Sequence, residues 1–399
     1  MNNGSIFTPA VASMQASAIR EIFKLIGSDD IISLAAGIPA PELFPSKEWS
    51  EITSDILTNN AKTALVYGVT EGYLPLRNLT KERSKKLGVF SEEEDELIIT
   101  SGAQQAIDLT AKVLLNVGDG VICEEPSFIG SLNSFRSYGA KLYGADNEAD
   151  GINTEQVEAL LKANDNIKLI YTIPTFQNPS GTTMSLEKRK TLLELAEKYD
   201  VYILEDNPYG ELRFKGEAMP TIKSLDKSGR VIYAGTYSKT LAPGIRVGFL
   251  SARRDIVDRV VVVKQVNDVN TAVISQMMVH EFITRHDFDA HVEKCSKVYG
   301  KRCELMLSEM DKKFPKECTY TRPDGGIFIL CTMPEGTNTN EMLRAAIEKK
   351  VAFVPGNTFM IDIDKPSNVF RLNYSVTNEE TIVKGIDLLA GVVNDFANR

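Results

Sequence analysis

The sequence predicts an α/β fold with a large domain, whose mostly parallel sheet is covered by helices, and a smaller α+β domain. From about residue 95 to residue 250, short β-branched runs alternate with segments of helical period, which is typical of a parallel sheet between helices. After about residue 285 this alternation gives way to a charged helical stretch and shorter apolar runs. At 399 residues the chain is also long for one hydrophobic core.

The alternating region supplies the strands and helices of the large domain. Residues 104–118 carry apolar side chains at i, i+4, i+7 and i+8, which predicts an amphipathic helix with Gly118 as its C-cap. A second amphipathic helix is expected over residues 187–200. The runs that predict strands are 96–100, 121–126, 168–174, 201–206 and 231–235, with a further apolar run at 247–250.

Three parts of the chain differ in pattern and give the expected domain boundaries. Residues 1–45 contain a helix-like stretch (17–27) and the proline-rich GIPAPELFP, and we expect an arm that contributes to the small domain. Residues 46–285 form the predicted large domain, and residues 286–399 the small C-terminal domain. In the small domain, strands are expected within 321–334, 351–356 and 369–375, and a helix over 340–350.

Composition excludes several classes of protein. A net charge of −9 argues against non-specific nucleic-acid binding, and the longest apolar runs are too short to span a bilayer. The first residues lack the pattern of a signal peptide. The five cysteines include no C-x-x-C pair, which favours reduced thiols in the cytoplasm. With three histidines, all between residues 280 and 291, neither a histidine metal site nor a Ser-His-Asp triad is expected.

Polar and aromatic residues follow each predicted strand. In parallel sheets, ligands bind beyond the carboxyl ends of the strands, so residues at these positions are expected to share one site. They are Ser101 to Gln104, Pro126 to Phe128, Gln177 to Pro179, Asp206 to Tyr209, and Ser238 with Lys239.

Two of these segments suit a phosphate group. SGAQQ (101–105) lies at a strand-to-helix junction and offers backbone N–H groups at the positive end of a helix dipole, although an ordinary helix start has the same pattern. The turn GTYSKTLAPGIR (235–246) adds the hydroxyls of Thr236 and Ser238 and the guanidinium of Arg246. In a partly buried cationic environment, Lys239 would have a lowered pKa and could form a Schiff base; a surface lysine on a turn is the alternative.

Two further residues complete a recognisable set. Asp206 ends an apolar strand, where a buried carboxylate needs a cationic or proton-donating partner. Asn178 lies in a QNPSG turn. Each residue also suits an ordinary cap or turn. Together, a phosphate cradle, a Schiff-base lysine and an acid for a pyridinium nitrogen indicate pyridoxal 5′-phosphate (PLP) as the cofactor.

Motifs along nearly the whole chain resemble those of fold type I PLP enzymes, the aspartate aminotransferase family. The chain most closely resembles the branch of 2-aminoadipate and kynurenine aminotransferases, which also contains the aminotransferase-like half of some bacterial regulators. The motifs are GIPAPELFP, YGVTEGYLPLR (67–77, counted from Tyr67), SGAQQ, EEPSF, PTFQNPSG, EDNPYGELRF, YSKTLAPGIRVG and FRLNYS. The combination of S-K-x-x-x-x-G-x-R, Q-N-P-x-G and D-x-x-Y is highly specific.

The resemblance implies a role for each residue around the cofactor ring. Lys239 would bind PLP as a Schiff base and move the proton between the substrate Cα and the C4′ carbon. Asp206 would keep the pyridine nitrogen protonated, while Asn178 and Tyr209 hydrogen-bond to O3′. Phe128 would stack on the ring, at a position where many relatives carry tyrosine; core packing is its alternative role.

The resemblance also implies the phosphate ligands and the assembly. The phosphate would be bound by the N–H groups of Ala103 and Gln104, and by Thr236, Ser238 and Arg246. Relatives often carry serine at position 103, so one side-chain contact is expected to be absent. Tyr67 resembles a tyrosine that reaches the phosphate from the neighbouring subunit, which implies a homodimer; a packing tyrosine is the alternative.

For the substrate, the resemblance implies that Arg371 binds the α-carboxylate, with Asn178 beside it and Gly37 leaving room near the ring. A structural ion pair is the alternative for Arg371. Arg20 lies off the apolar stripe of the N-terminal helix, where some relatives bind a side-chain carboxylate and where a solvated surface charge is equally expected.

The function predicted is a PLP-dependent aminotransferase. It would move the amino group of an L-amino acid (2-aminoadipate, aromatic or branched-chain) to a 2-oxo acid such as 2-oxoglutarate, without a metal. A PLP-dependent lyase, such as a C–S lyase, would share the first step. The effector domain of a regulator is a second alternative, but such chains carry a basic winged-helix domain, for which this acidic sequence has no room. A nicotinamide enzyme is disfavoured because no G-x-G-x-x-G follows a strand.

Overall fold

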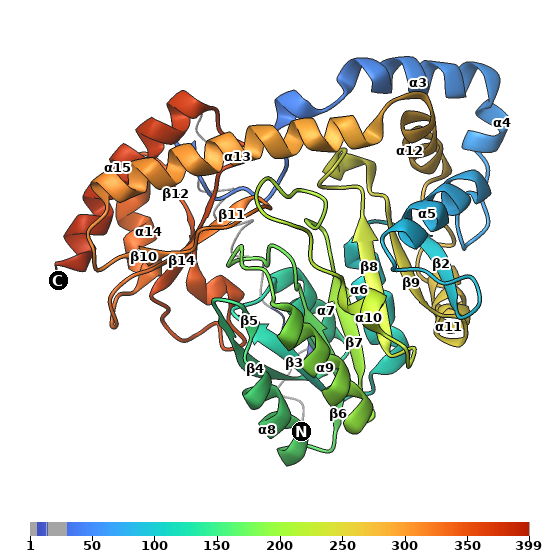
Figure 1. The fold of residues 1–399 in the computed structure, drawn as a ribbon, viewed down its shortest axis with the longest axis horizontal. Helices are drawn as coiled ribbons and strands as arrows, with labels where there is room; N and C mark the ends of the chain where they lie inside the picture. Colours follow the sequence, from blue (N-terminus) through green and yellow to red (C-terminus); the bar gives the residue numbers. More distant parts are fainter. Residues whose placement is uncertain (1–5, 13, 15–29, 399) are drawn as a thin grey trace.

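The computed structural model describes residues 6–12, 14 and 30–398. A large sheet with helices on both faces occupies one side of the molecule, and smaller sheets with helices packed on them occupy the other (Figure 1). The 26-residue helix α13 (Phe288–Lys313) runs across both parts. The predicted α/β class with a mostly parallel sheet is confirmed.

The large sheet has eight strands in the order β2-β9-β8-β7-β6-β3-β4-β5. Strands β8, β7, β6, β3 and β4 pair in parallel, whereas β9 is antiparallel to both β2 and β8, and β5 is antiparallel to β4. The bounds are β2 Asp95–Thr100, β3 Gly120–Glu125, β4 Lys141–Glu148, β5 Gly151–Ile152, β6 Ile167–Thr172, β7 Tyr202–Asp206, β8 Val231–Thr236 and β9 Gly248–Arg253.

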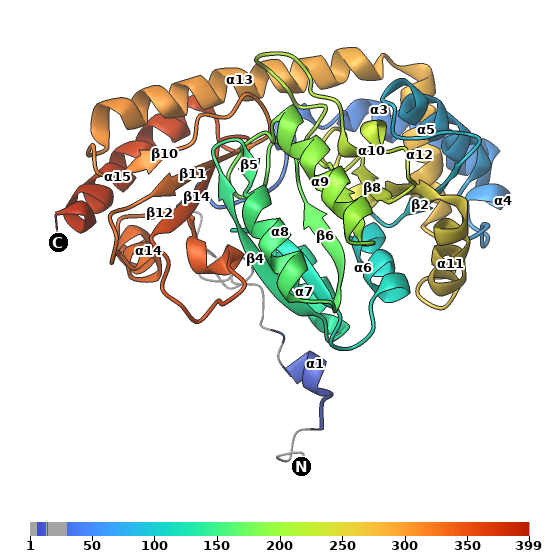
Figure 2. The same cartoon turned by 60° about the horizontal axis from the view of Figure 1, so that its bottom comes forward.

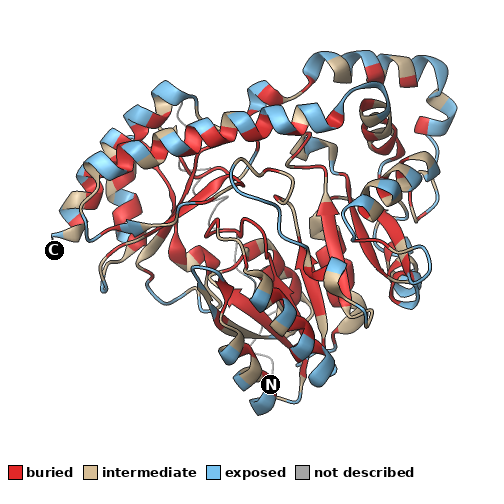
Figure 3. Cartoon of the chain, in the orientation of Figure 1, coloured by how far each residue is buried: buried red, intermediate tan, exposed pale blue. Residues whose placement is uncertain are grey.

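The central strands are apolar at successive positions because both of their faces are covered. Leu204 and Ile232 pack on one face in a cluster with helices α6, α7 and α11, while their neighbours Ile203 and Val231 pack on the other face with α8, α9 and α10. Figure 3 shows the strands buried and the helices exposed on their outer sides. The bounds are α6 Ala103–Leu114, α7 Ile129–Ser137, α8 Thr154–Ala163, α9 Leu186–Lys198, α10 Ile222–Leu225 and α11 Arg254–Gln265.

The second part of the molecule is built on a four-stranded antiparallel sheet in the order β10-β11-β14-β13. Ahead of the large sheet in sequence, β1 (Ile32–Ser33) pairs in parallel with β12 (Val351–Ala352), so a segment near the N-terminus joins C-terminal strands. The other bounds are β10 Thr319–Tyr320, β11 Phe328–Thr332, β13 Val354–Pro355, β14 Val369–Asn373, α14 Thr339–Glu348 and α15 Glu379–Ala397.

A helical layer lies beside β2 and α11 (Figure 1). Helix α12 (Val273–Arg285) packs against α3 (Ser46–Asn59), α4 (Ala61–Ala64) and α5 (Leu74–Lys86). The short helix α1 (Pro9–Ala12) projects from the body of the molecule below α7 and α8 in Figure 2. Short 3-10 helices in the described part of the chain span Pro41–Leu43, Pro243–Ile245 and Gly356–Phe359.

Two local predictions need correction or qualification. Helix α6 ends at Leu114 rather than at a Gly118 cap, because Leu115 is already extended, and Gly118 lies in the following turn with φ of +90°. The predicted helix over 17–27 falls outside the described residues. Within the described part of the chain, no helix is both long and apolar enough to cross a membrane.

Candidate active site

A cavity of about 420 Å³ opens where the large sheet meets β14 of the small sheet. Its polar walls come from the ends of β6, β7 and β8, from the start of α6 and from β14. Of the predicted site residues that the structure describes, all except Tyr67 line it, namely Gly37, Ala103, Gln104, Phe128, Asn178, Asp206, Tyr209, Thr236, Ser238, Lys239, Arg246 and Arg371. The fold therefore collects residues from distant parts of the chain at one edge of the sheet.

One end of the cavity has the geometry of an anion site. Helix α6 begins at Ala103 with no side-chain cap, so N–H groups of its first turn lack intrahelical partners. The Arg246 Nη2 donates to the Ser101 carbonyl at 2.9 Å, which places the guanidinium against the loop that starts the helix. Arg246 itself has a left-handed backbone (φ 53°) and is exposed. The Thr236 hydroxyl donates to Ser238 Oγ at 2.9 Å, which brings two hydroxyls to the same end.

Lys239 lies in the turn after β8 and lines the same cavity. Its Nζ donates to the Gly37 carbonyl at 2.7 Å and lies 5.9 Å from the centre of the Tyr209 ring. Burial, together with the nearby cations Arg371 and Arg246, lowers the pKa of Lys239 to about 8. A larger fraction of this amine is therefore neutral, and nucleophilic, near neutral pH than for an ordinary lysine.

Asp206, the last residue of β7, has one free carboxylate oxygen. The Tyr171 hydroxyl donates to Oδ2 at 2.8 Å, whereas the buried Oδ1 has no hydrogen-bond partner among the described residues. Burial raises the pKa of Asp206 to about 7. A buried carboxylate with one unpaired oxygen is costly, so this site calls for a proton or a cationic donor in the cavity.

Arg371 faces the same space from β14 and is 1% exposed. Its Nη1 donates to Asn178 Oδ1 and its Nη2 to the Ala35 carbonyl, both at 2.8 Å. Its guanidinium carbon lies 4.0 Å from the centre of the Phe328 ring. Burial lowers the pKa of Arg371 to about 10. No carboxylate appears among its hydrogen-bond partners in the described residues, which leaves the guanidinium available for an anionic ligand.

Space beside Arg371 depends on Gly37. A Cβ at position 37 would lie 3.4 Å from the Phe328 ring and 3.8 Å from Arg371 Nη2. Asn178, which lies in the turn after β6, accepts a hydrogen bond from the Arg371 guanidinium and so connects it to that turn. The side-chain amide of Gln104 points away, to the Gly130 carbonyl and Ser134, so only its backbone N–H is available to the cavity.

Two predicted residues are not among those that line the cavity in the described part of the chain. Tyr67 is 86% exposed and does not line the cavity of its own chain. Arg20 lies outside the described residues. The sequence reasoning missed Tyr171 and Phe328, which contact Asp206 and Arg371. A tyrosine inside the buried strand KLIYT was a usable signal for Tyr171, because a buried hydroxyl needs a partner, whereas Phe328 has the appearance of any core residue.

Comparison with known proteins agrees with this geometry. Residues 29–388 match the family described as aminotransferase class I and II. The chain is 40% identical to aromatic-amino-acid aminotransferase 1 of Thermococcus litoralis over 98% of this chain and 94% of that protein.

Two solved structures are similar over nearly their whole length. The kynurenine aminotransferase of Pyrococcus horikoshii, in complex with PMP and kynurenine, has a TM-score of 0.93 and 38% identity, and the match covers 98% of this chain and 97% of that one. The alpha-aminoadipate aminotransferase of Thermus thermophilus, complexed with N-(5′-phosphopyridoxyl)-L-leucine, has a TM-score of 0.90 and 36% identity, with 98% of each chain covered.

The sheet, the cavity and these similarities define a fold type I PLP-dependent transferase. The chain belongs to the class I and II aminotransferase family and transfers an amino group from an amino acid to a 2-oxo acid. The donor set fits PLP: the unpaired Asp206 Oδ1 suits a protonated pyridine nitrogen, and the uncapped start of α6 with Arg246 suits a phosphate.

Proposed function

We propose that Lys239, Asp206 and Arg371 carry the transamination chemistry of this chain. The observation that carries the proposal is their arrangement: an amine, an unpaired carboxylate oxygen and a guanidinium that no carboxylate neutralises among the described residues border one cavity. These are the groups needed to move a proton, hold a pyridinium nitrogen and bind an α-carboxylate.

PLP, when bound, supplies an electron sink for the bond that breaks at the substrate Cα. Asp206 Oδ1 would accept a hydrogen bond from the protonated ring nitrogen, with Tyr171 holding the other oxygen. Arg371 would fix the α-carboxylate and so orient the Cα–H bond toward Lys239. Lys239 Nζ, with its pKa lowered to about 8, would take this proton from the substrate Cα and deliver it to the C4′ carbon of the cofactor.

The remaining predicted residues position the cofactor. The N–H groups of Ala103 and Gln104, the hydroxyls of Thr236 and Ser238, and Arg246 would form the phosphate cradle. Asn178 and Tyr209 would hydrogen-bond to O3′, and Phe128 would cover one face of the ring.

We infer that the amino donor is an L-amino acid, namely an aromatic or branched-chain amino acid or 2-aminoadipate, and that 2-oxoglutarate is an acceptor. Apolar side chains make up much of the wall, including Ile38, Phe128 and Phe328, which supports apolar donors. The relatives named for aromatic amino acids, kynurenine and aminoadipate support the same range. For an acidic side chain, Arg20 is the proposed ligand.

A homodimer with Tyr67 reaching the neighbouring site is supported by an exposed apolar run. Leu65, Val66, Tyr67 and Val69 are between 57% and 86% exposed, which is unusual for contiguous large hydrophobic residues of a monomer.

We retain the division into an arm (1–45), a large domain (46–285) and a small domain (286–399), which the pairing of β1 with β12 supports. Five free buried cysteines support a cytoplasmic location.

Replacement of the proposed Schiff-base lysine tests the site. Lys239→Ala should remove the visible absorbance of lysine-bound PLP and reduce transamination by several orders of magnitude, because both the covalent link and the proton carrier are lost. The measurement is the absorbance spectrum and the rate of glutamate formation from 2-oxoglutarate. A borohydride-reducible bond to PLP at another lysine of this variant would contradict the assignment.

The substrate range is tested by a screen of about twenty amino acids against 2-oxoglutarate. Aromatic, branched-chain and 2-aminoadipate donors should react. Arg20→Ala should lower kcat/KM for 2-aminoadipate far more than for aromatic donors, because only the acidic side chain needs a cation. An equal loss for all donors would exclude the proposed role of Arg20.

A further inference from the structure

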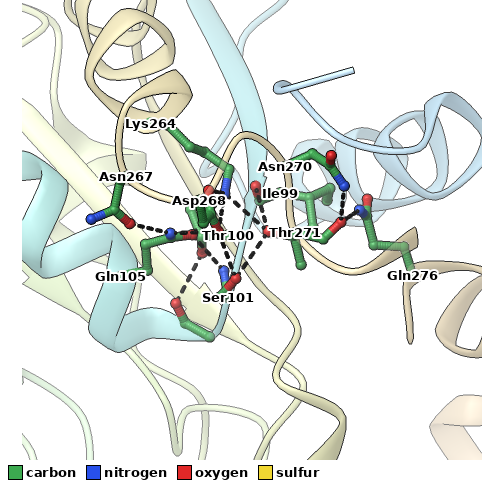
Figure 4. A network of polar contacts seen from close by, with 11 residues as sticks. Ile99, Thr100, Ser101, Gln105, Lys264, Asn267, Asp268, Asn270, Thr271 and Gln276 are labelled. Atoms are coloured by element: carbon green, nitrogen blue, oxygen red, sulfur yellow. Dashed lines mark hydrogen bonds and ion pairs between the residues drawn. The ribbon is translucent and has the colours of Figure 1, made fainter. Parts of the chain in front are cut away.

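A partly buried polar cluster lies beside the loop that starts α6 (Figure 4). It consists of Ser101, Gln105, Lys264, Asp268 and Thr271, and we call it the Lys264 cluster. Lys264 comes from the end of α11, and Asp268 and Thr271 from the loop before α12. None of the five lines the cavity.

Lys264 is the centre of this cluster and its side chain is 0% exposed. Its Nζ donates to both Asp268 oxygens at 2.7 and 2.9 Å and to Gln105 Oε1 at 2.8 Å. A contact of 3.1 Å to Thr271 Oγ1 adds a further acceptor. Burial acts to raise the pKa of Asp268, but hydrogen bonds from Lys264, Gln105 and Ser101 outweigh it and hold that pKa below its ordinary value.

The cluster holds Ser101 by both its backbone and its side chain. Gln105 Oε1, which accepts from Lys264, also accepts the Ser101 backbone N–H at 2.7 Å. The Ser101 hydroxyl donates to Asp268 Oδ2 at 3.0 Å. Lys264 and Asp268 therefore fix this residue from two directions.

Ser101 in turn connects the cluster to the proposed phosphate cradle. Its carbonyl accepts the hydrogen bond from Arg246 Nη2 at 2.9 Å, and Gly102 separates it by one residue from Ala103, the first residue of α6. A shift of Ser101 would therefore move the guanidinium of Arg246 and the first N–H groups of α6 together.

Stability alone does not account for a buried lysine at this place, paired with an aspartate whose side chain is 25% exposed. Burying an ammonium costs several kcal/mol, and apolar replacements of buried ion pairs are often neutral or stabilising. The hydrogen bonds of Lys264 and Asp268 converge on the loop at Ser101 and fix its geometry, which apolar side chains could not do.

We propose that the Lys264 cluster is a positioning site for the cofactor phosphate: it fixes Ser101 so that Arg246 and the start of α6 meet the phosphate in the correct geometry. The proposal rests on the phosphate cradle described above. Lys264 acts through Ser101 and Gln105 and does not touch the cofactor.

The test compares two aldehydes that differ only in the phosphate. The full-length chain, freed of cofactor, is titrated with PLP and with pyridoxal, and binding is followed by the visible absorbance of the lysine-bound aldehyde. Lys264→Met should weaken PLP binding by about tenfold or more, as for other residues that orient a ligand-binding group, while pyridoxal binding changes less than about threefold. Asp268→Asn, which keeps the size of the side chain, should likewise lower the affinity for PLP more than the affinity for pyridoxal.

Lys223→Met is a matched control. Lys223 and Asp95 form another buried pair, at 2.8 Å and with side chains 6% and 5% exposed, and neither lines the cavity. This variant should keep the wild-type ratio of PLP to pyridoxal affinity. If Lys264→Met and Asp268→Asn both retain that ratio, or if Lys223→Met loses it to the same extent, the positioning role is wrong. If the wild-type chain binds pyridoxal as tightly as PLP, the phosphate cradle itself is wrong.

Discussion

Asp206 occupies a position where the fold supplies only part of the hydrogen bonding that a buried carboxylate needs. Tyr171 donates a hydrogen bond to Oδ2, and no residue in the described part of the chain donates one to Oδ1. Its burial raises the pKa of Asp206 to about 7, and the negative Glu124 nearby acts in the same direction. A cationic ring nitrogen would reverse this effect, because an opposite charge favours the ionised carboxylate.

This arrangement predicts how the stability of the cofactor-free chain depends on pH. The carboxyl of Asp206 titrates near 3.8 when unfolded and near 7 when folded, so the folded chain holds the proton more tightly. The stabilising contribution of this carboxyl to folding is fully present below about pH 4 and is lost as the pH rises through about 7. The free energy of unfolding falls by up to about 4 kcal/mol over this range. Urea unfolding of wild type and Asp206→Asn between pH 4 and 8 measures it.

The difference between the two chains isolates Asp206, because Glu124 and Glu205 are also buried with raised pKa values and are present in both. Wild type should lose stability relative to Asp206→Asn between about pH 4 and pH 7 and remain parallel to it above that range. A constant difference across the whole range would show that Asp206 is ionised throughout in the folded chain.

At the same scale, the sequence was informative where a residue carries unusual chemistry. Asp206 is identified because a carboxylate at the end of an apolar strand needs a partner. Lys239 is identified from the hydroxyls and the second cation of its turn, and Arg371 from the resemblance to aminotransferases. Phe328, which lies 4.0 Å from the Arg371 guanidinium, was missed because an aromatic residue in an apolar strand has many possible environments. Tyr171 was missed since its partner is 35 residues away on the next strand.

Among the elements, the loop before α6 and the turn after β8 depend on each other. Gly102 has φ of +79°, and a Cβ there would lie 2.5 Å from Arg246 Nη2. Glycine is therefore needed for two reasons, its backbone conformation and the closeness of the guanidinium.

Gly102→Ala should weaken PLP binding by tenfold or more, about 1.4 kcal/mol, because it displaces Arg246 from the Ser101 carbonyl. Gly118→Ala is the control: it has φ of +90° but nothing within 4 Å of the added Cβ, so it should lose about 1 kcal/mol of stability with unchanged PLP affinity. Titration with PLP and thermal unfolding separate the two effects. Equal PLP affinities in the two variants would show that strain alone matters at Gly102.

Elements were predicted better than their ends and pairings. The helical period located α6 and α9, but α6 ends four residues before Gly118, because the extended conformation of Leu115 stops it. The apolar runs located β2 and β9, whose antiparallel pairing was not anticipated. Local pattern determines which segments are apolar on which side, whereas direction within the sheet depends on connections that a single sequence does not specify.

At the scale of the whole molecule, the segment that follows the exposed run from Leu65 to Val69 is connected by hydrogen bonds to the Lys264 cluster. Gln276 accepts the Tyr73 backbone N–H at 2.7 Å and donates to the Thr271 carbonyl at 2.7 Å, so the segment after Tyr67 is linked to the Lys264 cluster. A second subunit bound at Leu65 to Val69 would thus contact a segment connected to the phosphate cradle of this one.

If Tyr67 completes the site of the partner, Tyr67→Ala should lower activity, and this variant and Lys239→Ala should restore one another. Tyr67→Ala leaves Lys239 intact, and Lys239→Ala leaves Tyr67 intact, so a hybrid dimer has one site with both residues and one with neither. With random pairing of equal amounts of the two variants, about half of the dimers are hybrids, and activity should return to about a quarter of wild type. The measurement is transamination after the mixed subunits are unfolded and refolded together, with each variant refolded alone as the control. Formation of hybrids, verified by mass spectrometry of differently tagged chains, without any recovery would place Tyr67 outside the neighbouring site and leave the exposed apolar run as a contact surface alone.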